Sequence, residues 1–284
     1  MPKQSGKLKH LGLFDLTGRV AVITGGAGLL GQKHAEAIAS AGGHVALVDQ
    51  NEAGVRTASD RIAKHYGVEA VGLRCDITHP QGVETMVKRV KDRFRRIDIL
   101  INNAAMTAKE GSSHQEDYFA PFEEYSLALW EKALAVNLTG MFLCTQAVGK
   151  VMVRQKKGVI VNIASTAGVV APHHEIYQGV KSPYSGKPFN TPISYSTTKA
   201  AVINFTRYLA TYWAKKNIRV NALSPGGVYD NHDPAFVKNY SSLVPMGRMA
   251  DRDEYKGAIL FLVSDASSYM TGTNLIVDGG LTCW

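Results

Sequence analysis

Short apolar runs alternate along the chain with longer segments whose apolar residues recur at helical spacing. The runs fall at residues 19–24, 44–49, 69–76, 97–105, 158–165, 218–227 and 274–280. The helical segments fall at 29–41, 51–66, 80–94, 123–155, 195–216 and 253–265, the fourth long enough for one or two helices. Because the runs are apolar at successive positions, they predict strands buried on both faces. We therefore expect an α/β fold, a doubly wound parallel sheet with helices on both faces.

The bulk properties are those of one ordinary domain. The 284 residues are 45% hydrophobic and 20% charged, and we find neither internal repeats nor a linker. We expect residues 1–15 to form a basic tail and residues 16–284 a single nucleotide-binding domain. The start of the chain lacks the apolar stretch of a signal peptide, and no run approaches the length of a membrane span. These features predict a cytoplasmic protein without membrane contact.

Net charge and cysteine content limit the classes of ligand and partner that we expect. The formal net charge is +8, but the basic residues are dispersed, which favours a solvated surface and tail. An anionic substrate is the alternative, and we expect no nucleic acid partner. Cys75, Cys144 and Cys283 are odd in number and lack metal-type spacing, so they indicate reduced thiols. His173 and His174 are adjacent without an evident third ligand, and we expect no metal site.

A glycine-rich turn follows the first apolar run. In TGGAGLLG, Gly25, Gly28 and Gly31 recur every three residues. Glycine permits positive φ and lets a phosphate approach the backbone closely. The helix that begins here would direct its free N–H groups and positive dipole end at a pyrophosphate. The turn therefore indicates a dinucleotide site, with a purely structural tight turn as the alternative.

Acidic residues end the second and third runs. Asp49 lies eighteen positions after Gly31, near the spacing of a carboxylate that binds an adenosine ribose. Because a carboxylate repels a 2′-phosphate and Gln50 offers no arginine, we expect NAD in preference to NADP. Asp76 is expected to meet the adenine amino group, with Ile77 packing on the ring. Capping of the following helix is the alternative for both aspartates.

Tyr195 and Lys199 are spaced as a proton-transfer pair. At i and i+4 they share one helix face. Tyrosine has a pKa near 10, and a lysine ammonium together with a positive nicotinamide ring would favour its phenolate form. We expect the shift to bring the hydroxyl into the range useful for a general base at neutral pH. Two ordinary helix residues are the alternative.

Several motifs occur in a characteristic order: TGGAGLLG, Asp49, NNAA, Asn137, NIAS, YSTTK and SPGG. Together they resemble the short-chain dehydrogenases/reductases over roughly residues 16–280, which implies a Rossmann-type fold. The resemblance implies four catalytic positions: Ser165, Tyr195, Lys199 and Asn137. The cofactor-binding positions predicted from the patterns and this resemblance are Thr24, Gly25, Gly28, Leu29, Leu30, Gly31, Asp49, Gln50, Asp76, Ile77, Asn103, Ala104, Ala105, Tyr195, Lys199, Pro225, Gly226 and Val228.

The resemblance also assigns roles and shows departures. Ser165 would bind the substrate oxygen, Lys199 would also bind the nicotinamide ribose, and Asn137 would support a water-mediated proton path. Leu29 stands where compact members carry glycine and matches the spacing of the longer sugar-nucleotide branch. NNAA replaces NNAG, and Asp230 stands where a threonine often contacts the carboxamide.

Three long segments surround the predicted chemistry. The stretch 169–192 is longer than in compact relatives and rich in aromatic and basic residues. We expect it to form a substrate-side lid, with a subunit contact as the alternative. The loop 106–122 is expected to form the opposite wall, and 231–250 a mobile cover over the cofactor. The amino-acid sequence as a whole also resembles dehydrogenases of bacterial surface-sugar and flagellin-glycan synthesis.

The sequence thus predicts an NAD-dependent enzyme that interconverts a secondary alcohol and a ketone on a polar, sugar-like or anionic substrate. An epimerase or dehydratase that retains NAD is the alternative, as is a non-catalytic NAD-binding or sensing protein. The resemblance further implies a homo-oligomer, dimer or tetramer, formed through the helices around 123–155 and 195–216 and the last strand.

Overall fold

A computed structural model describes residues 11–106, 117–181, 186 and 190–284. Seven parallel strands form one sheet in the order β3-β2-β1-β4-β5-β6-β7. The predicted basic tail lies mostly outside the described residues. The strands are β1 (Val20–Thr24), β2 (His44–Asp49), β3 (Ala70–Arg74), β4 (Ile99–Asn102), β5 (Gly158–Ile163), β6 (Ile218–Pro225) and β7 (Asn274–Val277).

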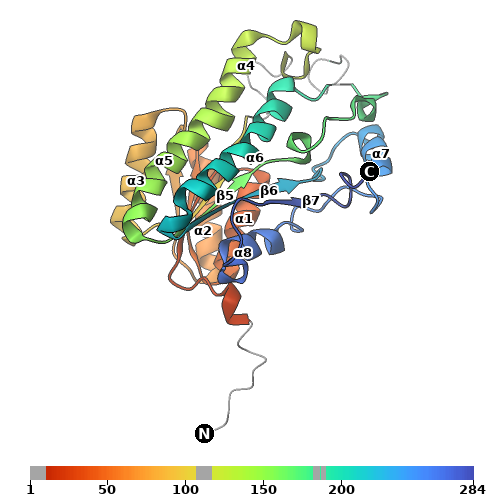
Figure 1. Ribbon diagram of the computed structural model, residues 1–284. Helices are drawn as coiled ribbons and strands as arrows, with labels where there is room; N and C mark the ends of the chain where they lie inside the picture. Colours follow the sequence, from red (N-terminus) through yellow and green to blue (C-terminus); the bar gives the residue numbers. More distant parts are fainter. Residues whose placement is uncertain (1–10, 107–116, 182–185, 187–189) are drawn as a thin grey trace, which may run out of the picture.

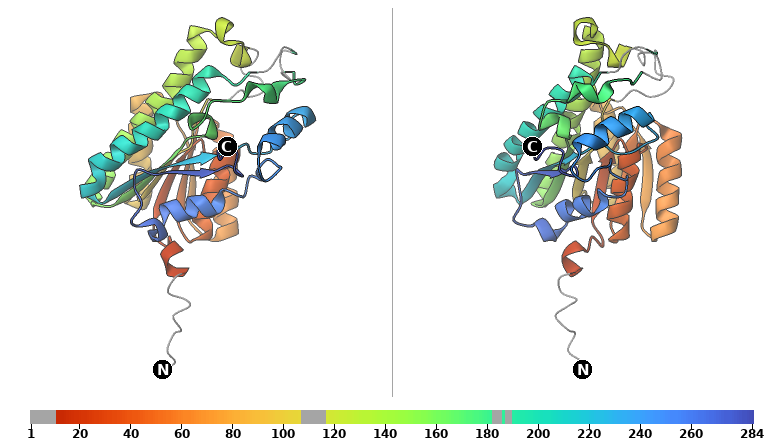
Figure 2. Two further views of the ribbon diagram at one scale, coloured as in Figure 1. Left: turned by 45° about the vertical axis from the view of Figure 1, so that its right-hand side comes forward. Right: turned by 90° about the vertical axis from the view of Figure 1, so that its right-hand side faces the viewer.

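Helices cover both faces of the sheet (Figure 2), which confirms the predicted doubly wound α/β fold. One face carries α1 (Leu29–Ser40), α2 (Glu52–Tyr66) and α8 (Lys256–Val263). The other carries α3 (Pro80–Phe94), α5 (Met141–Gln155) and α6 (Ile193–Trp213). Right-handed crossovers between parallel strands place helices in this way.

The two helical layers enclose two separate hydrophobic cores. Val20 and Val22 of β1 pack into the core beneath α3, α5 and α6. Their neighbours Ala21 and Ile23 point the opposite way, into the core beneath α1, α2 and α8. Successive strand residues alternate between faces, so a strand buried on both faces is apolar at most positions. Its buried polar exceptions, such as Asn162, are hydrogen-bonded inside the protein. The continuous apolar runs of the sequence follow from this burial.

The segment predicted as one or two helices is a single helical stretch with a change of winding. It comprises α4 (Leu127–Leu134), a π-helical segment η4 (Ala135–Gly140) and α5. The stretch Leu127–Gln155 has a window of mean hydropathy 1.3, long and apolar enough by composition to cross a membrane. The expectation that no run approaches this length was wrong. The stretch packs against β4, β5 and the neighbouring helices, which accounts for its apolar residues.

One helix was missed. The segment expected as a cover contains α7 (Pro234–Leu243), whose first turn is capped by the carboxylate of Asp233. Figure 1 shows α7 and the C-terminus beyond the tips of β6 and β7. Only part of the 169–192 insertion is described, and it includes the short helix η6 (His174–Tyr177). Residues 107–116 of the expected opposite wall lie outside the described chain.

Candidate active site

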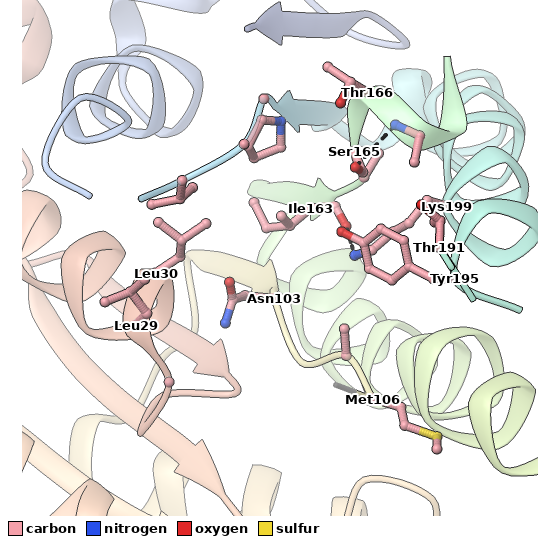
Figure 3. A pocket seen from close by; sticks show the side chains of 18 of the residues that line it. Leu29, Leu30, Asn103, Met106, Ile163, Ser165, Thr166, Thr191, Tyr195 and Lys199 are labelled. Carbon is pink, nitrogen blue, oxygen red and sulfur yellow. Dashed lines mark hydrogen bonds between the residues drawn. The ribbon is translucent and has the colours of Figure 1, made fainter. Parts of the chain in front are cut away.

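A cavity of about 1100 Å³ opens at the carboxyl ends of the strands. Its lining comes from the turns after β1 to β6, from α7 and from the last residues of the chain. In open parallel sheets the strand ends diverge around such a crevice, because the connections leave in opposite directions. Figure 3 shows Leu29 and Leu30 across the cavity from Ser165, Tyr195 and Lys199.

The glycine-rich turn is packed too closely for side chains. Gly25 has φ +65°, and a Cβ there would lie 2.8 Å from the side-chain nitrogen of Asn103. A Cβ on Gly31 would lie 2.1 Å from the carbonyl oxygen of Gly25. Gly28 caps α1 without any side-chain hydrogen bond. The N–H groups of the first helical turn are therefore left to a ligand, and an N-terminal helix dipole favours an anionic one.

Hydrogen bonds of Asn103 and Thr24 hold the glycine-rich turn against the end of β4. The side-chain amide of Asn103 donates to the carbonyl oxygens of Thr24 (3.0 Å) and Gly25 (3.2 Å). The Thr24 hydroxyl accepts the backbone N–H groups of Asn103 and Ala104, both at 3.1 Å. As predicted, the strand β4 runs into a loop, after Asn102, and these bonds join the ends of β1 and β4.

Both predicted acidic residues line the cavity, and both also support local structure. Asp49 accepts the N–H of Ala27 at 3.2 Å and that of Asn51 at 3.0 Å. Asp76 accepts the N–H and hydroxyl of Thr78. These hydrogen bonds help to hold the pKa of Asp76 below its ordinary value, although burial opposes them. Neither side chain caps the following helix, because the N-cap residues of α2 and α3 are Asn51 and His79. The capping alternative was therefore wrong, and both aspartates bond to nearby turns while they line the cavity.

Ser165, Tyr195 and Lys199 converge from β5 and α6. Ser165 follows β5, is buried, and accepts the N–H of Ala167 through its hydroxyl at 3.2 Å. Lys199 is buried and donates to the carbonyl oxygen of Ile163 at 2.7 Å. Its nitrogen lies 5.6 Å from the ring centroid of Tyr195. The three side chains form one cluster at the cavity wall (Figure 3).

Burial dominates the electrostatics of this cluster in the protein alone. Burial raises the pKa of Tyr195, while a hydrogen bond with Ser165 lowers it by less. Burial also lowers the pKa of Lys199 to about 8. The ammonium faces the aromatic ring and is bound to a backbone carbonyl, so the lysine alone does not make this phenol acidic. A lowering of the Tyr195 pKa by Lys199 together with a positive nicotinamide ring stays a prediction.

Asn137 lies in the π-helical segment, and both the oxygen and the nitrogen of its side-chain amide form hydrogen bonds. Its carbonyl oxygen accepts the N–H of Met106 at 2.7 Å, and its amide donates to the Thr198 hydroxyl at 3.0 Å. π-helical turns insert an extra residue and are frequent at functional sites. Asn137 does not line the cavity. It connects the loop after β4 to α6, one residue before Lys199.

Most predicted site residues meet at the cavity. Thr24, Gly31 and Asn137 stand behind its wall. The predicted residues that line it are Gly25, Gly28, Leu29, Leu30, Asp49, Gln50, Asp76, Ile77, Asn103, Ala104, Ala105, Ser165, Tyr195, Lys199, Pro225, Gly226 and Val228. Asp230, noted for replacing a threonine, lines it too and lies 3.7 Å from Arg252. Among the described residues, no metal-binding cluster occurs.

The insertion and α7 form a joint cover that sequence reasoning did not foresee. Tyr177 of η6 stacks on Phe236 of α7 with ring centroids 5.5 Å apart. Asn239 donates to the backbone carbonyls of Ile176 and Gln178. The Tyr177 hydroxyl is 2.7 Å from that of Thr191, next to the start of α6. The contacts agree with a place at the substrate side for the described part of the insertion.

The end of the chain completes this wall. Trp284 lines the cavity, and its indole N–H donates to the carbonyl oxygen of Leu243 at 3.2 Å. Leu281 packs against the same cluster as α7. A tryptophan at a C-terminus gives no periodic signal, and only the fold brings it here. Asp233–Pro234, a capping residue before a helix-starting proline, was the available signal for α7.

Comparison with known proteins identifies the family. Models described as short chain dehydrogenase and as enoyl-(acyl carrier protein) reductase match residues 19–182 and 182–282. The chain is 34% identical over 274 residues to D-threitol dehydrogenase of Mycolicibacterium smegmatis, covering 95% of each chain. It is 33% identical to NADP-dependent mannitol dehydrogenase of Hypocrea jecorina, covering 96% of this chain and 95% of that one. The chain belongs to the short-chain dehydrogenase/reductase family.

A solved structure gives the same result. The structure of an NAD⁺-bound xylitol dehydrogenase matches with a TM-score of 0.80 at 33% identity, covering 93% of this chain and 99% of that one. The names of these relatives contain both NAD and NADP. Family membership therefore indicates a nicotinamide cofactor and oxidoreduction at a CH–OH group, without choosing between the two dinucleotides.

Proposed function

We propose that the protein is an NAD-dependent dehydrogenase that interconverts a secondary alcohol and a ketone on a polyol or sugar-like substrate. The observation that supports this most is the convergence of Ser165, Tyr195 and Lys199 on one cavity with the uncapped N-terminus of α1. A dinucleotide has a charged middle and two bulky ends, and the cavity offers an anion site with room on both sides.

The residues at the cavity suit NAD(H). The first turn of α1 would bind the pyrophosphate through its N–H groups, and Asp49 would accept the adenosine ribose hydroxyls. Asp76 and Ile77 would contact the adenine. The turn from Pro225 to Val228 would border the nicotinamide, opposite Tyr195. When bound, NAD(H) would accept or supply the hydride of the reaction.

The proton is assigned to Tyr195. Its hydroxyl would take the proton of the substrate alcohol during oxidation and return it during reduction. Ser165 would donate a hydrogen bond to the substrate oxygen and keep it near the phenol. Lys199 would bind the nicotinamide ribose and supply positive charge beside the ring. Burial raises the pKa of Tyr195 in the protein alone, and the positive charges of Lys199 and of a bound nicotinamide ring would both act to lower it.

Asp49 favours NAD. Its carboxylate lines the cavity and already accepts two backbone N–H groups. A 2′-phosphate placed beside it would bring two like charges together in a partly desolvated site, which costs free energy. The next two residues, Gln50 and Asn51, are uncharged, so neither offers a positive side chain that would offset that cost.

The substrate class rests on the cavity's substrate side and on the relatives. The wall there includes Thr191, His173, Tyr177 and Trp284. Such a mixture of polar groups and flat apolar faces suits hydroxylated carbon chains and sugar rings. The relatives named for D-threitol and mannitol dehydrogenation favour a polyol. The resemblance to surface-sugar enzymes keeps sugar derivatives in the same proposal.

One assay tests the function. Purified protein is mixed with NAD⁺ or NADP⁺ and a panel of polyols, sugars, sugar phosphates and nucleotide sugars, and reduced nicotinamide is followed by absorbance. We expect net NADH formation with at least one polyol or sugar. Substrate conversion without net NADH would instead favour the epimerase or dehydratase alternative, which Leu29 and the insertion motivate. Cofactor binding without any conversion would favour the sensing alternative.

A further inference from the structure

Two tyrosine hydroxyls hold the glycine turn that follows β6. The Tyr240 oxygen of α7 accepts the backbone N–H of Gly227 at 2.6 Å. From the opposite side of the turn, the Tyr255 hydroxyl donates to the carbonyl oxygen of Gly226 at 3.3 Å. Tyr240 is 9% exposed and Tyr255 is fully buried. The turn is thus held by side chains from two separate helical segments.

Packing makes the Tyr240 contact specific. A Cβ on Gly227 would lie 2.6 Å from the Cζ atom of Tyr240, so the ring lies directly against the glycine backbone. The Gly227 carbonyl accepts the N–H of Ala250 at 2.9 Å. Burial raises the pKa of Tyr240, and hydrogen bonds with the Gly227 N–H and the Thr166 hydroxyl oppose that shift. The hydrogen bond that fixes this hydroxyl to the turn is the one from the Gly227 N–H.

Tyr240 also belongs to the joint cover. It packs in one apolar cluster with Ile176 of the insertion and with Val244 and Met249. The same helix carries Phe236 and Asn239, which fix η6. One side chain therefore contacts both the substrate-side cover and the turn at the predicted nicotinamide end, and it lines the cavity itself.

We propose that Tyr240 is a positioning residue for the nicotinamide, because its hydroxyl keeps the Gly226–Gly227 turn in the conformation that borders the ring. This inference rests on the proposed dinucleotide function. The ring of Tyr240 fills space that phenylalanine also fills, so only the hydroxyl is needed for this role. Its loss leaves the Gly227 N–H without its tyrosine acceptor and lets the turn move relative to the cavity.

The test compares two ligands that differ only at the nicotinamide end. Calorimetry gives Kd for NADH and for ADP-ribose with the wild-type protein, Tyr240→Phe and Tyr66→Phe. Tyr66 ends α2 and does not line the cavity. We expect Tyr240→Phe to weaken NADH binding roughly three- to tenfold, as for one lost buried hydrogen bond, with ADP-ribose binding unchanged. Tyr66→Phe should change neither.

A second variant checks the same turn from the other side. Gly227→Ala pushes a Cβ into the Tyr240 ring and should produce the same selective loss of NADH affinity. Equal weakening of both ligands, or no weakening in either variant, would overturn the inference while leaving the proposed function intact. A wild-type protein that binds neither NADH nor ADP-ribose would overturn the proposed function and this inference together.

Discussion

The ammonium nitrogen of Lys199 lies over the ring of Tyr195, 5.6 Å from its centroid, and its hydrogen bond goes to the carbonyl oxygen of Ile163. Spacing of four residues on one helix brought the pair together, but the backbone of β5 decides where the charge is held. In the protein alone, burial raises the pKa of the Tyr195 phenol, and the hydrogen bond with Ser165 lowers it by less.

Removal of the Tyr195 hydroxyl should abolish most turnover while leaving cofactor binding intact. We expect Tyr195→Phe to lower kcat by about 10²- to 10⁴-fold, the usual range for one general acid–base group. Kd for NADH should stay within about twofold, because the ring is retained. Steady-state kinetics and calorimetry provide the two values, with Tyr66→Phe as the matched control. Turnover at the wild-type rate would contradict the assignment of the proton to this residue.

Lys199 should contribute to activity at the expense of stability. Burial lowers its pKa to about 8 from 10.5, so the folded state resists a charge that the unfolded chain carries freely. The free-energy cost of burying Lys199 is complete below about pH 8 and disappears as pH rises toward 10.5. At 1.36 kcal/mol per pKa unit, the cost at neutral pH is about 3 kcal/mol.

Lys199→Met keeps the side-chain length and removes the charge. The variant also loses the hydrogen bond to the Ile163 carbonyl, which reduces the expected gain in the free energy of unfolding by about 1 kcal/mol. We expect the free energy of unfolding at pH 7 to rise by about 2 kcal/mol, measured by urea denaturation without cofactor, while activity falls at least about tenfold. The gain should shrink between pH 8 and 10. A variant less stable than wild type at pH 7 would show that the buried ammonium is stabilising.

His34 on α1 should limit stability in acid. It is fully buried, and neither ring nitrogen has a hydrogen-bond partner among the described residues. Burial lowers its pKa to about 3 from 6.5, so below pH 6.5 the unfolded chain takes up a proton that the folded protein refuses. Stability that is present above pH 6.5 is lost as pH falls toward 3, by up to about 1.4 kcal/mol per pH unit.

His34→Met places an apolar side chain that cannot be protonated at this site. Between pH 6.5 and 5, we expect wild-type stability to fall by about 2 kcal/mol more than that of the variant. Urea midpoints at both pH values measure the difference. His79→Met, at a mostly exposed position before α3, serves as the control. Parallel pH profiles for wild type and His34→Met would refute the prediction.

Asp49 should decide between the two dinucleotides. Asp49→Asn keeps an acceptor for the N–H groups of Ala27 and Asn51 but removes the charge. We expect the ratio of kcat/KM for NAD⁺ to that for NADP⁺ to fall by about tenfold or more, since the repulsion of the 2′-phosphate disappears. Asp60→Asn, on the exposed side of α2, should leave the ratio unchanged. A ratio unaffected by Asp49→Asn would remove the ribose assignment.

The outer helices should form a subunit interface. Tyr208 and Tyr212 of α6 are each 65% exposed and stack on one another, and Phe142 of α5 is 46% exposed. Large apolar side chains grouped on one surface mark an interaction site. We expect light scattering to give a mass at least twice the chain mass of 30.8 kDa. The double change Tyr208→Arg and Tyr212→Arg should lower that mass; a monomeric wild type would contradict the prediction.

The sequence by itself determined the sheet and its flanking helices, and nearly all of the site residues that it predicted line the cavity. Strands buried on both faces are apolar at most positions, and a close phosphate site favours glycine, so both leave a local signal. The order of the motifs then predicted the family and the chemistry at Ser165 and Tyr195. These constraints act on neighbouring residues, and neighbours are what a sequence displays.

Tertiary structure alone decided the electrostatics and the far wall. The pKa of Tyr195 depends on its burial and on the position of the Lys199 ammonium. That ammonium is held by the carbonyl oxygen of Ile163, thirty-six residues before Lys199. The contact of Tyr240 with Gly227, the stack of Tyr177 on Phe236 and the place of Trp284 join segments separated along the chain. Such contacts arise from how the helices and turns pack, so no local pattern records them.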